Sequence, residues 1–466
     1  MPASPARAAA FEILLRIERE SSYASELLHS PVCAGLSNRD HALVTELVLG
    51  VLRWRSRLDE EIAAASSQSL SKLDTEVLTA LRLALYQLRC LDRIPKRAAL
   101  NESVELVKRA RKGSAAAFVN AVLRKLARKT ESYYFGILET ADLSLRSLAS
   151  ALAHPAWMIE RWIEEYGPLV ASRICEYDQL IPPTAIRLRA PSAEDDLKQE
   201  GVTVSPAQLL LSARVVITGE VAQTQAFRQG HVVIQDQASQ LVAALVAPRG
   251  HKERDKGEAT TPLSPRVRIL DCCAAPGGKT LAMADRNPDA SITAIELHPH
   301  RARLLKKLLR AAQVLGHIQV VVADAQRLPT SLPFDRVLAD VPCSGTGTLA
   351  RHPEIKWRLQ PHDLQDLQAR QSAILQSAVA RVASGGRVVY STCSLEREEN
   401  EDVVAQALAQ NNSFRVHDCR VELNRLKESG ELVFSDVGSL TRGPYLRTIP
   451  GLHPCEGFFA AILQKI

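Results

Sequence analysis

Hydrophobic residues recur at helical spacing throughout residues 1–150 of the chain. The stripes are formed by Phe11, Leu14, Leu15 and Ile17, by Leu43, Leu47, Leu49 and Leu52, and by Leu78, Leu81, Leu85 and Leu88. Ser37 and Ser71 are each followed three residues later by an aspartate, which is typical of a helix N-cap. Stripes of this kind usually face a protein core, so the pattern predicts an all-α bundle over residues 1–150.

The pattern changes after His154-Pro155. Residues 184–189 alternate between apolar and polar side chains like a strand, and the apolar run at residues 215–218 indicates a further strand. Residues 193–200 look helical. We therefore expect a small α+β domain over residues 151–233.

From residue 234 onward, short apolar runs alternate with helical stretches. The runs are residues 269–270, 292–295, 318–322, 337–338 and 388–390. This alternation predicts βαβ units and a parallel sheet, and therefore an α/β domain over residues 234–466. The last apolar run, residues 457–463, is expected to be an edge strand. The polar segment from His251 to Pro265 is expected to be an exposed loop.

Composition narrows the class of protein without identifying it. A chain of 466 residues suits about two or three domains, and no apolar run approaches the ~20 residues of a membrane helix. Residues 1–30 lack the apolar core of a signal peptide. Nine cysteines without paired spacing indicate a reducing compartment, so we expect a cytoplasmic protein. No cysteine or histidine spacing typical of zinc accompanies them, so no metal is expected.

Positive charge is concentrated in one part of the predicted bundle. The net charge of the chain is only +6, but residues 93–129 hold eleven basic residues against Glu102 and Glu105. The basic residues are Arg93, Lys96, Arg97, Lys108, Arg109, Arg111, Lys112, Arg124, Lys125, Arg128 and Lys129. Such a cluster is either a solvated helix face or a surface that follows phosphates, and the chemistry described below favours the second.

A glycine-containing turn follows the first predicted strand of the α/β domain. The strand ends in Asp271-Cys-Cys273, and Ala274-Ala-Pro-Gly-Gly-Lys-Thr280 enters the next helix. Gly277 and Gly278 allow a ligand to approach the backbone closely. A Walker A loop ending at Lys279 would need a glycine at position 273, where the chain has cysteine, and the dinucleotide pattern G-x-G-x-x-G is absent.

Acidic residues follow three successive strands of the same domain. Glu296 ends the second predicted strand, Asp324 follows the third, and Asp340 ends the fourth. A carboxylate after the second strand can accept both hydroxyl protons of a ribose, and Asp324 is placed for an adenine amine. Each acid taken alone is more often a helix cap. Three in order favour a nucleoside cofactor that is not held by phosphates.

Two cysteines, Cys343 and Cys393, lie at the ends of strands that run toward the same edge of the predicted sheet. Ligands of open α/β sheets bind at that edge. Buried cysteines are usually inert, but a thiolate here can be a nucleophile and a second thiol can assist it. The residues alone leave open which cysteine is the nucleophile.

These motifs together resemble the RNA (cytosine-5) methyltransferases of the Sun (Fmu) family. The matching segments are Asp271-Cys-Cys-Ala-Ala-Pro-Gly-Gly-Lys-Thr280, Asp340-Val-Pro-Cys-Ser-Gly-Thr-Gly347, Tyr390-Ser-Thr-Cys-Ser394 and Glu398-Glu-Asn400. Arg351-His-Pro-Glu-Ile-Lys-Trp357 is similar to a segment of the family's bacterial small-subunit rRNA branch, RsmB. The N-terminal helices resemble the NusB-like RNA-binding domain of that branch, and residues 155–230 resemble its small RNA-recognition subdomain.

The resemblance implies a multidomain fold and a set of site residues. The fold comprises an all-α NusB-like bundle, a small α+β RNA-recognition-like subdomain and a Rossmann-like methyltransferase domain that binds S-adenosyl-L-methionine. The implied cofactor contacts are Cys273, Ala274, Ala275, Pro276, Gly277, Gly278, Lys279, Glu296, Asp324 and Asp340. Cys393 would add to C6 of the cytosine and Cys343 would help release the product. The family usually has aspartate in place of Glu296, and glutamate can also bind a diol.

The substrate implied by the resemblance is small-subunit (16S) rRNA, either naked or in an early assembly intermediate, and a monomer is expected. Alternatives are 5-methylcytosine formation in tRNA or large-subunit rRNA, a DNA cytosine-5 methyltransferase, and a non-catalytic RNA-binding assembly factor. The Thr392-Cys393 motif and the basic helices argue against DNA, and the intact cysteines and acids argue against a non-catalytic protein. A methyltransferase of small molecules would leave the basic helices without a purpose.

Overall fold

The computed structural model describes residues 3–20, 22–128, 149–246 and 267–466. The chain divides into two compact units. The helical unit comprises Met1–Pro182 and Leu349–Leu359, and the sheet unit comprises Pro183–Thr348 and Gln360–Ile466. The predicted three-domain boundaries, 1–150, 151–233 and 234–466, stay a prediction. The predicted loop at residues 251–265 lies outside the described residues.

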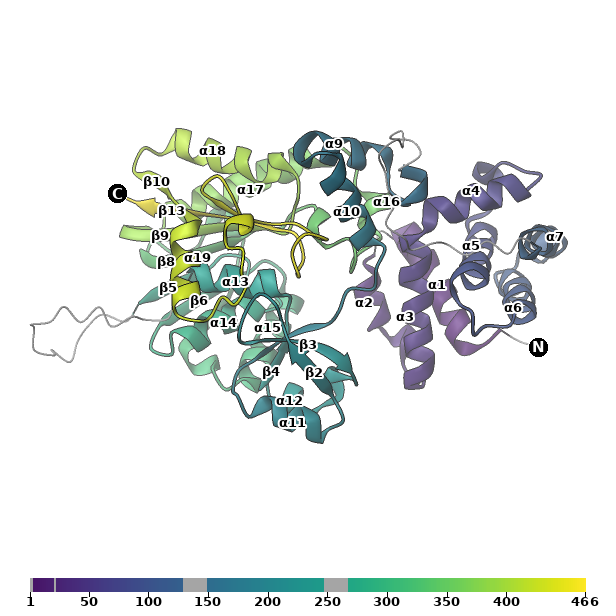
Figure 1. The fold of residues 1–466 in the computed structure, drawn as a ribbon, viewed down its shortest axis with the longest axis horizontal. Helices are drawn as coiled ribbons and strands as arrows, with labels where there is room; N and C mark the ends of the chain where they lie inside the picture. Colours follow the sequence, from purple (N-terminus) through teal and green to yellow (C-terminus); the bar gives the residue numbers. More distant parts are fainter. Residues whose placement is uncertain (1–2, 21, 129–148, 247–266) are drawn as a thin grey trace, which may run out of the picture. The chain divides into compact units, whose positions relative to one another are not determined.

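Helices form the described part of the helical unit, which confirms the all-α prediction for the N-terminus (Figure 1). They are α1 (Pro5–Glu20), α2 (Ala24–Leu28), α3 (Asn38–Arg53), α4 (Arg55–Ala65), α5 (Thr75–Cys90), α6 (Lys96–Arg109), α7 (Ala116–Ala127), α9 (Ala156–Tyr166), α10 (Pro168–Asp178) and α16 (Ile355–Arg358). Leu47, Leu81 and Leu85 of the predicted stripes are fully buried in the core of this unit. The stripes therefore face inward because burial of apolar surface stabilises the bundle.

The two predicted N-caps have different outcomes. The Ser37 hydroxyl accepts a hydrogen bond from the backbone N–H of Asp40 at the start of α3, as expected. Ser71 instead lies in the short 3-10 helix η2 (Leu70–Lys72), and Asp74 is the residue that precedes α5. The cap prediction at Ser71 was wrong because a serine followed by an aspartate also suits a turn between two helices.

The segment Leu349–Leu359, which we call the strap, leaves the sheet unit and packs within the helical unit. Trp357 donates its indole N–H to the carbonyl of Leu52 at 2.6 Å, and Glu354 accepts the backbone N–H of Ala24 at 3.0 Å. Lys356 is buried and donates to the carbonyls of Arg53 and Ala153, at 2.9 and 3.0 Å. These bonds fix a short, mostly irregular segment that carries only one helical turn of its own.

The sheet unit is built on a nine-stranded mixed sheet with the order β11-β12-β13-β9-β8-β5-β6-β7, in which β10 also pairs with β13. The strands are β5 (Arg268–Asp271), β6 (Ser291–Glu296), β7 (Ile318–Val322), β8 (Phe334–Asp340), β9 (Val382–Thr392), β10 (Phe414–His417), β11 (Thr441–Arg442), β12 (Tyr445–Thr448) and β13 (Phe458–Lys465). Strands β5 to β9 pair in parallel, which confirms the predicted α/β architecture.

Helices cover both faces of this sheet (Figure 1). One core contains Ile269 and Leu338 and packs under α13 (Gln237–Val246), α14 (Gly278–Arg286) and α15 (Pro299–Ala311). The other contains Leu270 and Val337 and packs under α17 (Asp363–Val379) and α18 (Glu401–Gln410). Neighbouring residues of one strand enter opposite cores, as the pleat of a strand requires. The remaining helix of the unit's C-terminal part, α19 (Cys419–Glu428), contributes Leu423 to the first core.

The last strand is not at the edge of the sheet, which corrects the prediction for residues 457–463. Strand β13 pairs antiparallel with β9 on one side and with β12 and β10 on the other. Its residues Phe458 to Leu463 are all buried. A strand that is apolar on both faces is usually covered on both faces. Edge strands usually carry charged residues or proline, and residues 457–463 have neither.

A second, four-stranded antiparallel sheet forms the small α+β part of the sheet unit. Its order is β2-β3-β1-β4. Its elements are β1 (Ala185–Leu188), α11 (Ala193–Gln199), β2 (Thr203–Pro206), β3 (Ala213–Thr218), α12 (Gln225–Arg228) and β4 (Val232–Ile234). Arg187 and Arg189 form ion pairs with Asp285 at the end of α14, at 2.6 and 2.7 Å. The predicted strands at 184–189 and 215–218 and the helix at 193–200 are therefore confirmed.

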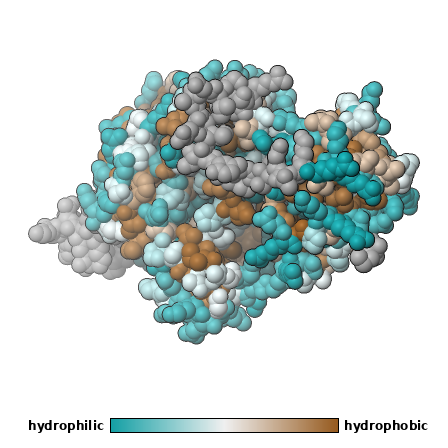
Figure 2. Space-filling view, turned by 45° about the vertical axis from the view of Figure 1, so that its right-hand side comes forward, coloured by the Kyte–Doolittle hydropathy of each residue, from teal (hydrophilic) through white to brown (hydrophobic). Residues whose placement is uncertain are grey.

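Hydrophilic side chains cover much of the face shown in Figure 2, with hydrophobic patches among them. Within the described residues, no helix is both long and apolar enough to cross a membrane.

The buried amine of Lys356 provides a test of the strap. Burial lowers the pKa of Lys356 to about 7 from a usual value of 10.5. Between these values the unfolded chain holds a proton that the folded chain lacks, so the unfolding free energy rises with pH. We predict that the unfolding free energy of wild type, relative to that of Lys356→Met, rises by up to about 1.4 kcal/mol per pH unit between about pH 7 and about pH 10. Urea denaturation measures both values.

The matched control is Lys108→Met, because Lys108 is exposed on α6 of the same unit. This control should show no such pH-dependent difference from wild type. The difference in unfolding free energy between wild type and Lys356→Met should change with pH over this interval. A constant difference would contradict the assignment of a neutral buried amine.

Candidate active site

The pairing of β8 with β9 brings the two predicted cysteines together. The strands are parallel, and Asp340 lies opposite Ser391 near their carboxyl ends. Cys343 lies three residues beyond the end of β8, and Cys393 directly follows β9. The two sulfur atoms are 3.3 Å apart, and both side chains are half-buried. Both thiols are therefore within reach of one reacting atom.

A close backbone contact fixes the loop that follows Cys343. The Gly347 N–H donates to the carbonyl of Cys393 at 2.9 Å. A Cβ atom added at Gly347 would lie 2.2 Å from the carbonyl oxygen of Gly457, so no other residue fits without a shift of the backbone. This glycine permits the loops of the two cysteines to touch.

Asn400 holds the residues on either side of Cys393. Its side-chain oxygen accepts the Thr392 hydroxyl at 2.5 Å, and its side-chain nitrogen donates to the carbonyl of Ser394 at 2.9 Å. Asn400 is fully buried. Both bonds act on the backbone turn that presents the Cys393 sulfur, so the orientation of this thiol is fixed before any ligand binds.

The environment favours the protonated form of Cys343. The hydrogen bond with Cys393, burial and the negative charge of Glu399 together raise the pKa of the Cys343 thiol well above its usual value. A protonated Cys343 can donate its S–H to the neighbouring sulfur. The two cysteines are therefore chemically different although they touch.

The glycine turn has the expected position between β5 and α14. Gly277 has a φ of 114°, a left-handed conformation that favours glycine, and a Cβ there would lie 2.6 Å from Leu305 Cδ1. At the start of the turn Asp271 is buried and accepts the Thr280 hydroxyl at 2.6 Å. Burial raises the pKa of Asp271 to about 7.

The carboxylate of Glu296 lies against the glycine turn. Its two oxygens accept the backbone N–H groups of Ala275, at 3.3 Å, and His298, at 2.9 Å. Asp324, by contrast, is exposed and accepts the N–H of Gln326, so it caps the short 3-10 helix η6 (Ala325–Arg327). The structure thus joins Glu296 to the turn and gives Asp324 the role of a cap.

An ion pair lies beside the cysteines. Lys279 Nζ and Asp340 Oδ2 are 2.8 Å apart, and Asp340 also accepts the Ser391 hydroxyl at 2.6 Å. Burial alone would lower the pKa of Lys279, but the Asp340 carboxylate, with a smaller effect of Cys393, raises it above its usual value. Lys279 therefore remains an ammonium close enough to Cys393 to interact with its sulfur.

The predicted residues thus form two linked groups, with Cys273 to Lys279 and Glu296 on one side and Lys279, Asp340, Cys343 and Cys393 on the other. Sequence reasoning gave no role to three buried groups: Gln371, Glu399 and Asn400. Glu399 and Asn400 belong to a motif that the resemblance contained, but a glutamate before a helix is usually exposed. In the described part of the chain, no group of three or more His, Cys, Asp or Glu side chains is arranged to hold a metal ion.

Comparisons with known proteins agree with this architecture. Residues 261–464 match the model of the family described as 16S rRNA methyltransferase RsmB/F, and residues 4–128 match the NusB family. The chain is 33% identical to the probable ribosomal RNA small subunit methyltransferase B of Bacillus subtilis, with both chains covered in full. It is 31% identical to the ribosomal RNA small subunit methyltransferase B of Vibrio cholerae, over 92% of this chain and 90% of that one.

Among solved structures, the fold is similar to that of PH0851, with a TM-score of 0.77, 20% sequence identity and full coverage of both chains. This similarity concerns the fold, since the identity is low.

The site makes one cysteine selectively reactive. We predict that iodoacetamide modifies Cys393 of the native protein at least about tenfold faster than Cys272. Cys272 is 1% exposed and burial raises its pKa well above the usual value, whereas Cys393 is only half-buried and interacts with the Lys279 ammonium. Peptide mass spectrometry measures both rates, and denatured protein is the control in which both residues react. Equal rates in the native protein would show that the Cys393 sulfur is not accessible.

Proposed function

Because the chain belongs to the 16S rRNA methyltransferase RsmB/F family, we propose that it transfers a methyl group from S-adenosyl-L-methionine to carbon 5 of a cytosine in small-subunit rRNA. The observation that carries the proposal is the 3.3 Å contact between the sulfurs of Cys343 and Cys393. Methylation of a pyrimidine carbon needs a nucleophile at C6 and assistance in its release, whereas methylation of an oxygen or nitrogen atom needs neither.

The residues around the glycine turn have the chemistry that this cofactor requires. Each oxygen of Glu296 accepts one backbone N–H and keeps a lone pair for a ribose hydroxyl. Cys273 to Lys279 would lie against the rest of the cofactor, and the exposed carboxylate of Asp324 retains acceptor capacity for an adenine amine. Bound S-adenosyl-L-methionine supplies an electrophilic methyl group on a sulfonium.

Cys393 is the proposed nucleophile. Its thiolate forms a bond to C6 of the cytosine, the aromatic ring is lost, and C5 becomes electron-rich enough to take the methyl group. A base then removes the C5 proton, the C5–C6 double bond forms again, and the bond between sulfur and C6 breaks. Cys343 assists the last step by donating its S–H to the departing Cys393 thiolate, which is consistent with the raised pKa of Cys343.

Lys279 and Asp340 contribute charge and orientation to the same chemistry. The Lys279 ammonium stabilises negative charge on the Cys393 sulfur, with which it interacts. Asp340 holds that ammonium at 2.8 Å and lies at the edge where the base must enter, so it can also accept the amine of the cytosine. The target cytosine must be single-stranded, looped or flipped, because C6 is otherwise inside a base stack.

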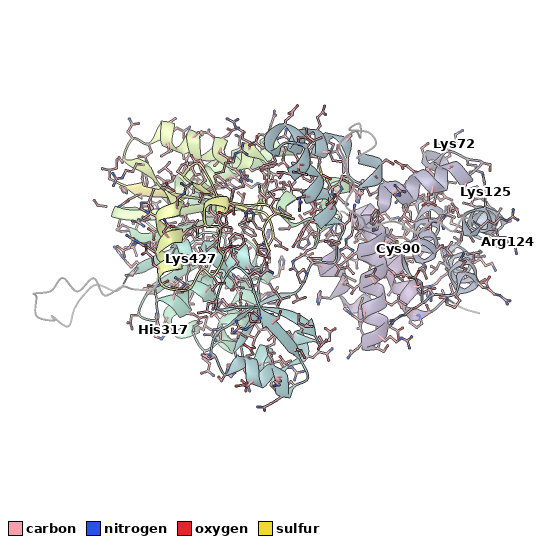
Figure 3. The ribbon with its side chains drawn as sticks, viewed as in Figure 1. Lys72, Cys90, Arg124, Lys125, His317 and Lys427 are labelled. Carbon is pink, nitrogen blue, oxygen red and sulfur yellow. The ribbon has the colours of Figure 1, made fainter. Side chains whose placement is uncertain are left out.

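The basic residues of α6 and α7 are the proposed RNA surface. Arg97, Arg109 and Arg124 are exposed, and Figure 3 shows Arg124 and Lys125 on α7 of the helical unit. Lys112 is half-buried and pairs with Asp74, so it is a weaker candidate. Residues 4–128 match the NusB family. We propose naked rRNA or an early assembly intermediate as the substrate and a monomer as the active form.

The covalent step can be tested by trapping. We predict that Cys343→Ala, incubated with S-adenosyl-L-methionine and unmodified small-subunit rRNA, accumulates a protein–RNA adduct that survives denaturant, because release is slowed. Cys393→Ala should form none, because no bond to C6 is made. Denaturing gel electrophoresis measures the adduct, and Cys272→Ala is the matched control that should turn over without trapping. The reverse pattern would exchange the roles of the two cysteines.

The substrate can be tested in a strain that lacks this protein. Bisulfite mapping should show the loss of a small-subunit 5-methylcytosine that wild-type protein restores. An unchanged small-subunit map would contradict the proposed substrate, and loss of a methylated cytosine in tRNA or large-subunit rRNA would identify the alternative.

The RNA surface predicts a change in the salt dependence of binding. The slope of log affinity against log salt concentration is negative. Replacing Arg97, Arg109 and Arg124 together by glutamine should make it less steep, by about 0.7 to 0.9 for each phosphate that is no longer neutralised. Filter binding at several salt concentrations measures the slope. Arg415→Gln is the matched control, because Arg415 is exposed on β10 of the sheet unit. An unchanged slope in the triple variant would exclude this surface.

A further inference from the structure

A buried carboxylate lies between the loops of the two cysteines. Glu399 is in the short 3-10 helix η8 (Arg397–Glu399), which follows β9 and precedes α18, and its side chain has no exposed surface. One carboxylate oxygen accepts the backbone N–H of Ser344 and the side-chain amide of Gln371, both at 2.8 Å. The other contacts the hydroxyls of Ser344 and Ser394, both at 2.5 Å. Four contacts therefore converge on one acidic group.

The residues that Glu399 contacts are those next to the reacting sulfurs. Ser344 directly follows Cys343, and Ser394 directly follows Cys393. The two serine hydroxyls are also 3.1 Å from each other. Gln371 of α17 donates a second hydrogen bond to the carbonyl of Pro342, at 3.0 Å, so it attaches the carboxylate and the Cys343 loop to the same helix. Burial raises the pKa of the Glu399 carboxyl above its usual value, and the hydrogen bonds from Ser344, Ser394 and Gln371 oppose this rise.

We infer that Glu399 is a positioning residue that holds the Cys343 and Cys393 sulfurs in contact by binding the serine after each cysteine. Its side chain is fully buried, so it acts through the two serines and not on the reacting atoms. The other groups that fix these loops act differently: Asn400 binds only the turn of Cys393, and the Gly347 contact joins the two loops through the backbone. The inference rests on the proposed function only for its effect on catalysis, because the geometry concerns the protein alone.

The charge of Glu399 also acts on the Cys343 thiol. It is one of the groups that raise the pKa of Cys343, after the hydrogen bond with Cys393 and burial. The ammonium of Lys279 lies on the Cys393 side, where it interacts with that sulfur, and Asp340 holds it there. The environment therefore favours the protonated form of Cys343. Tyr390 is another ionisable group near Cys343, and burial, followed by the charges of Glu399 and Cys343, raises the pKa of its hydroxyl.

The distance between the sulfurs can be measured without RNA or cofactor. Diamide oxidises two adjacent thiols to a disulfide and is itself reduced to a hydrazine. In the reduced full-length protein, we expect diamide to form the Cys343–Cys393 disulfide rapidly, as measured by mass spectrometry of the linked peptides. In Glu399→Gln the rate should fall by on the order of tenfold, since a misplacement of about 1 Å can cost about 100-fold in a proximity-dependent step.

The direction of the change in oxidation rate distinguishes a change in the distance between the sulfurs from a change in the charge near them. Removal of the Glu399 charge lowers the pKa of Cys343 and increases its thiolate fraction, which by itself would speed the oxidation. A slower reaction therefore shows that the two sulfurs have moved apart. Glu428→Gln, the same change at an exposed position of α19, is the matched control and should cross-link at the wild-type rate. A wild-type rate in Glu399→Gln would overturn the inference.

A second set of variants covers the case in which Glu399→Gln does not fold. The Ser394 hydroxyl makes the contact between Glu399 and the Cys393 loop, so Ser394→Ala should slow cross-linking in the same way, and Ser394→Thr should restore it. Where both single variants fold, the double variant Glu399→Gln/Ser394→Ala tests whether the two residues act together. It should cross-link no more slowly than the slower single variant, because both changes break the same hydrogen bond. Additive effects, or a Ser394→Ala protein that cross-links at the wild-type rate, would contradict the positioning role.

Catalysis supplies a separate readout. If the proposed function holds, kcat for rRNA methylation falls by about 100-fold in Glu399→Gln while the KM for RNA is unchanged, because only the sulfur geometry has changed. If the wild-type protein methylates no RNA, the proposed function is refuted. The positioning role would still stand if Glu399→Gln slows formation of the disulfide. A change in KM with kcat unchanged would overturn the positioning role.

Discussion

Parallel hydrogen bonding between β8 and β9 is the constraint on which the site depends. Because parallel strands end at the same edge of a sheet, the residues that follow Asp340 and Ser391 must share a small volume. The cysteines enter that volume from two loops, and Gly347 allows the loops to approach to backbone contact. The glycine turn after β5 and the carboxylate that ends β6 reach the same edge through the next parallel pairs. The order of strands therefore determines which side chains can meet.

Charge compensation within the sheet unit follows from the burial of this edge. A carboxylate or ammonium taken out of water is tolerated only where hydrogen bonds or opposite charge replace the lost hydration. Lys279 has Asp340 at 2.8 Å, and Arg447 has Glu401 at 2.8 Å. Glu399 has no basic partner at hydrogen-bond distance among its four contacts and relies on neutral donors instead. Such groups make the site rigid, because movement of one leaves others without partners.

The sequence predicted the elements well and their contacts less well. Alternation and spacing located the strands that end at Glu296 and Asp340, because periodicity reports which faces are buried. The same signal does not reveal which strand lies beside which, and the run at 457–463 was therefore placed at an edge although β13 is flanked on both sides. Glu399 was missed for a related reason: an acid before a helix usually faces solvent, and only the fold of two distant loops encloses it.

The strap has a consequence for how this protein can be divided and inherited. The chain passes between its two units after Pro182, after Thr348 and after Leu359. A gene fragment that begins at residue 183 would encode Lys356 and Trp357 without the carbonyl groups that they bind in the helical unit. Exchange of the helical unit between related genes by recombination would have to transfer two separate stretches of sequence at once.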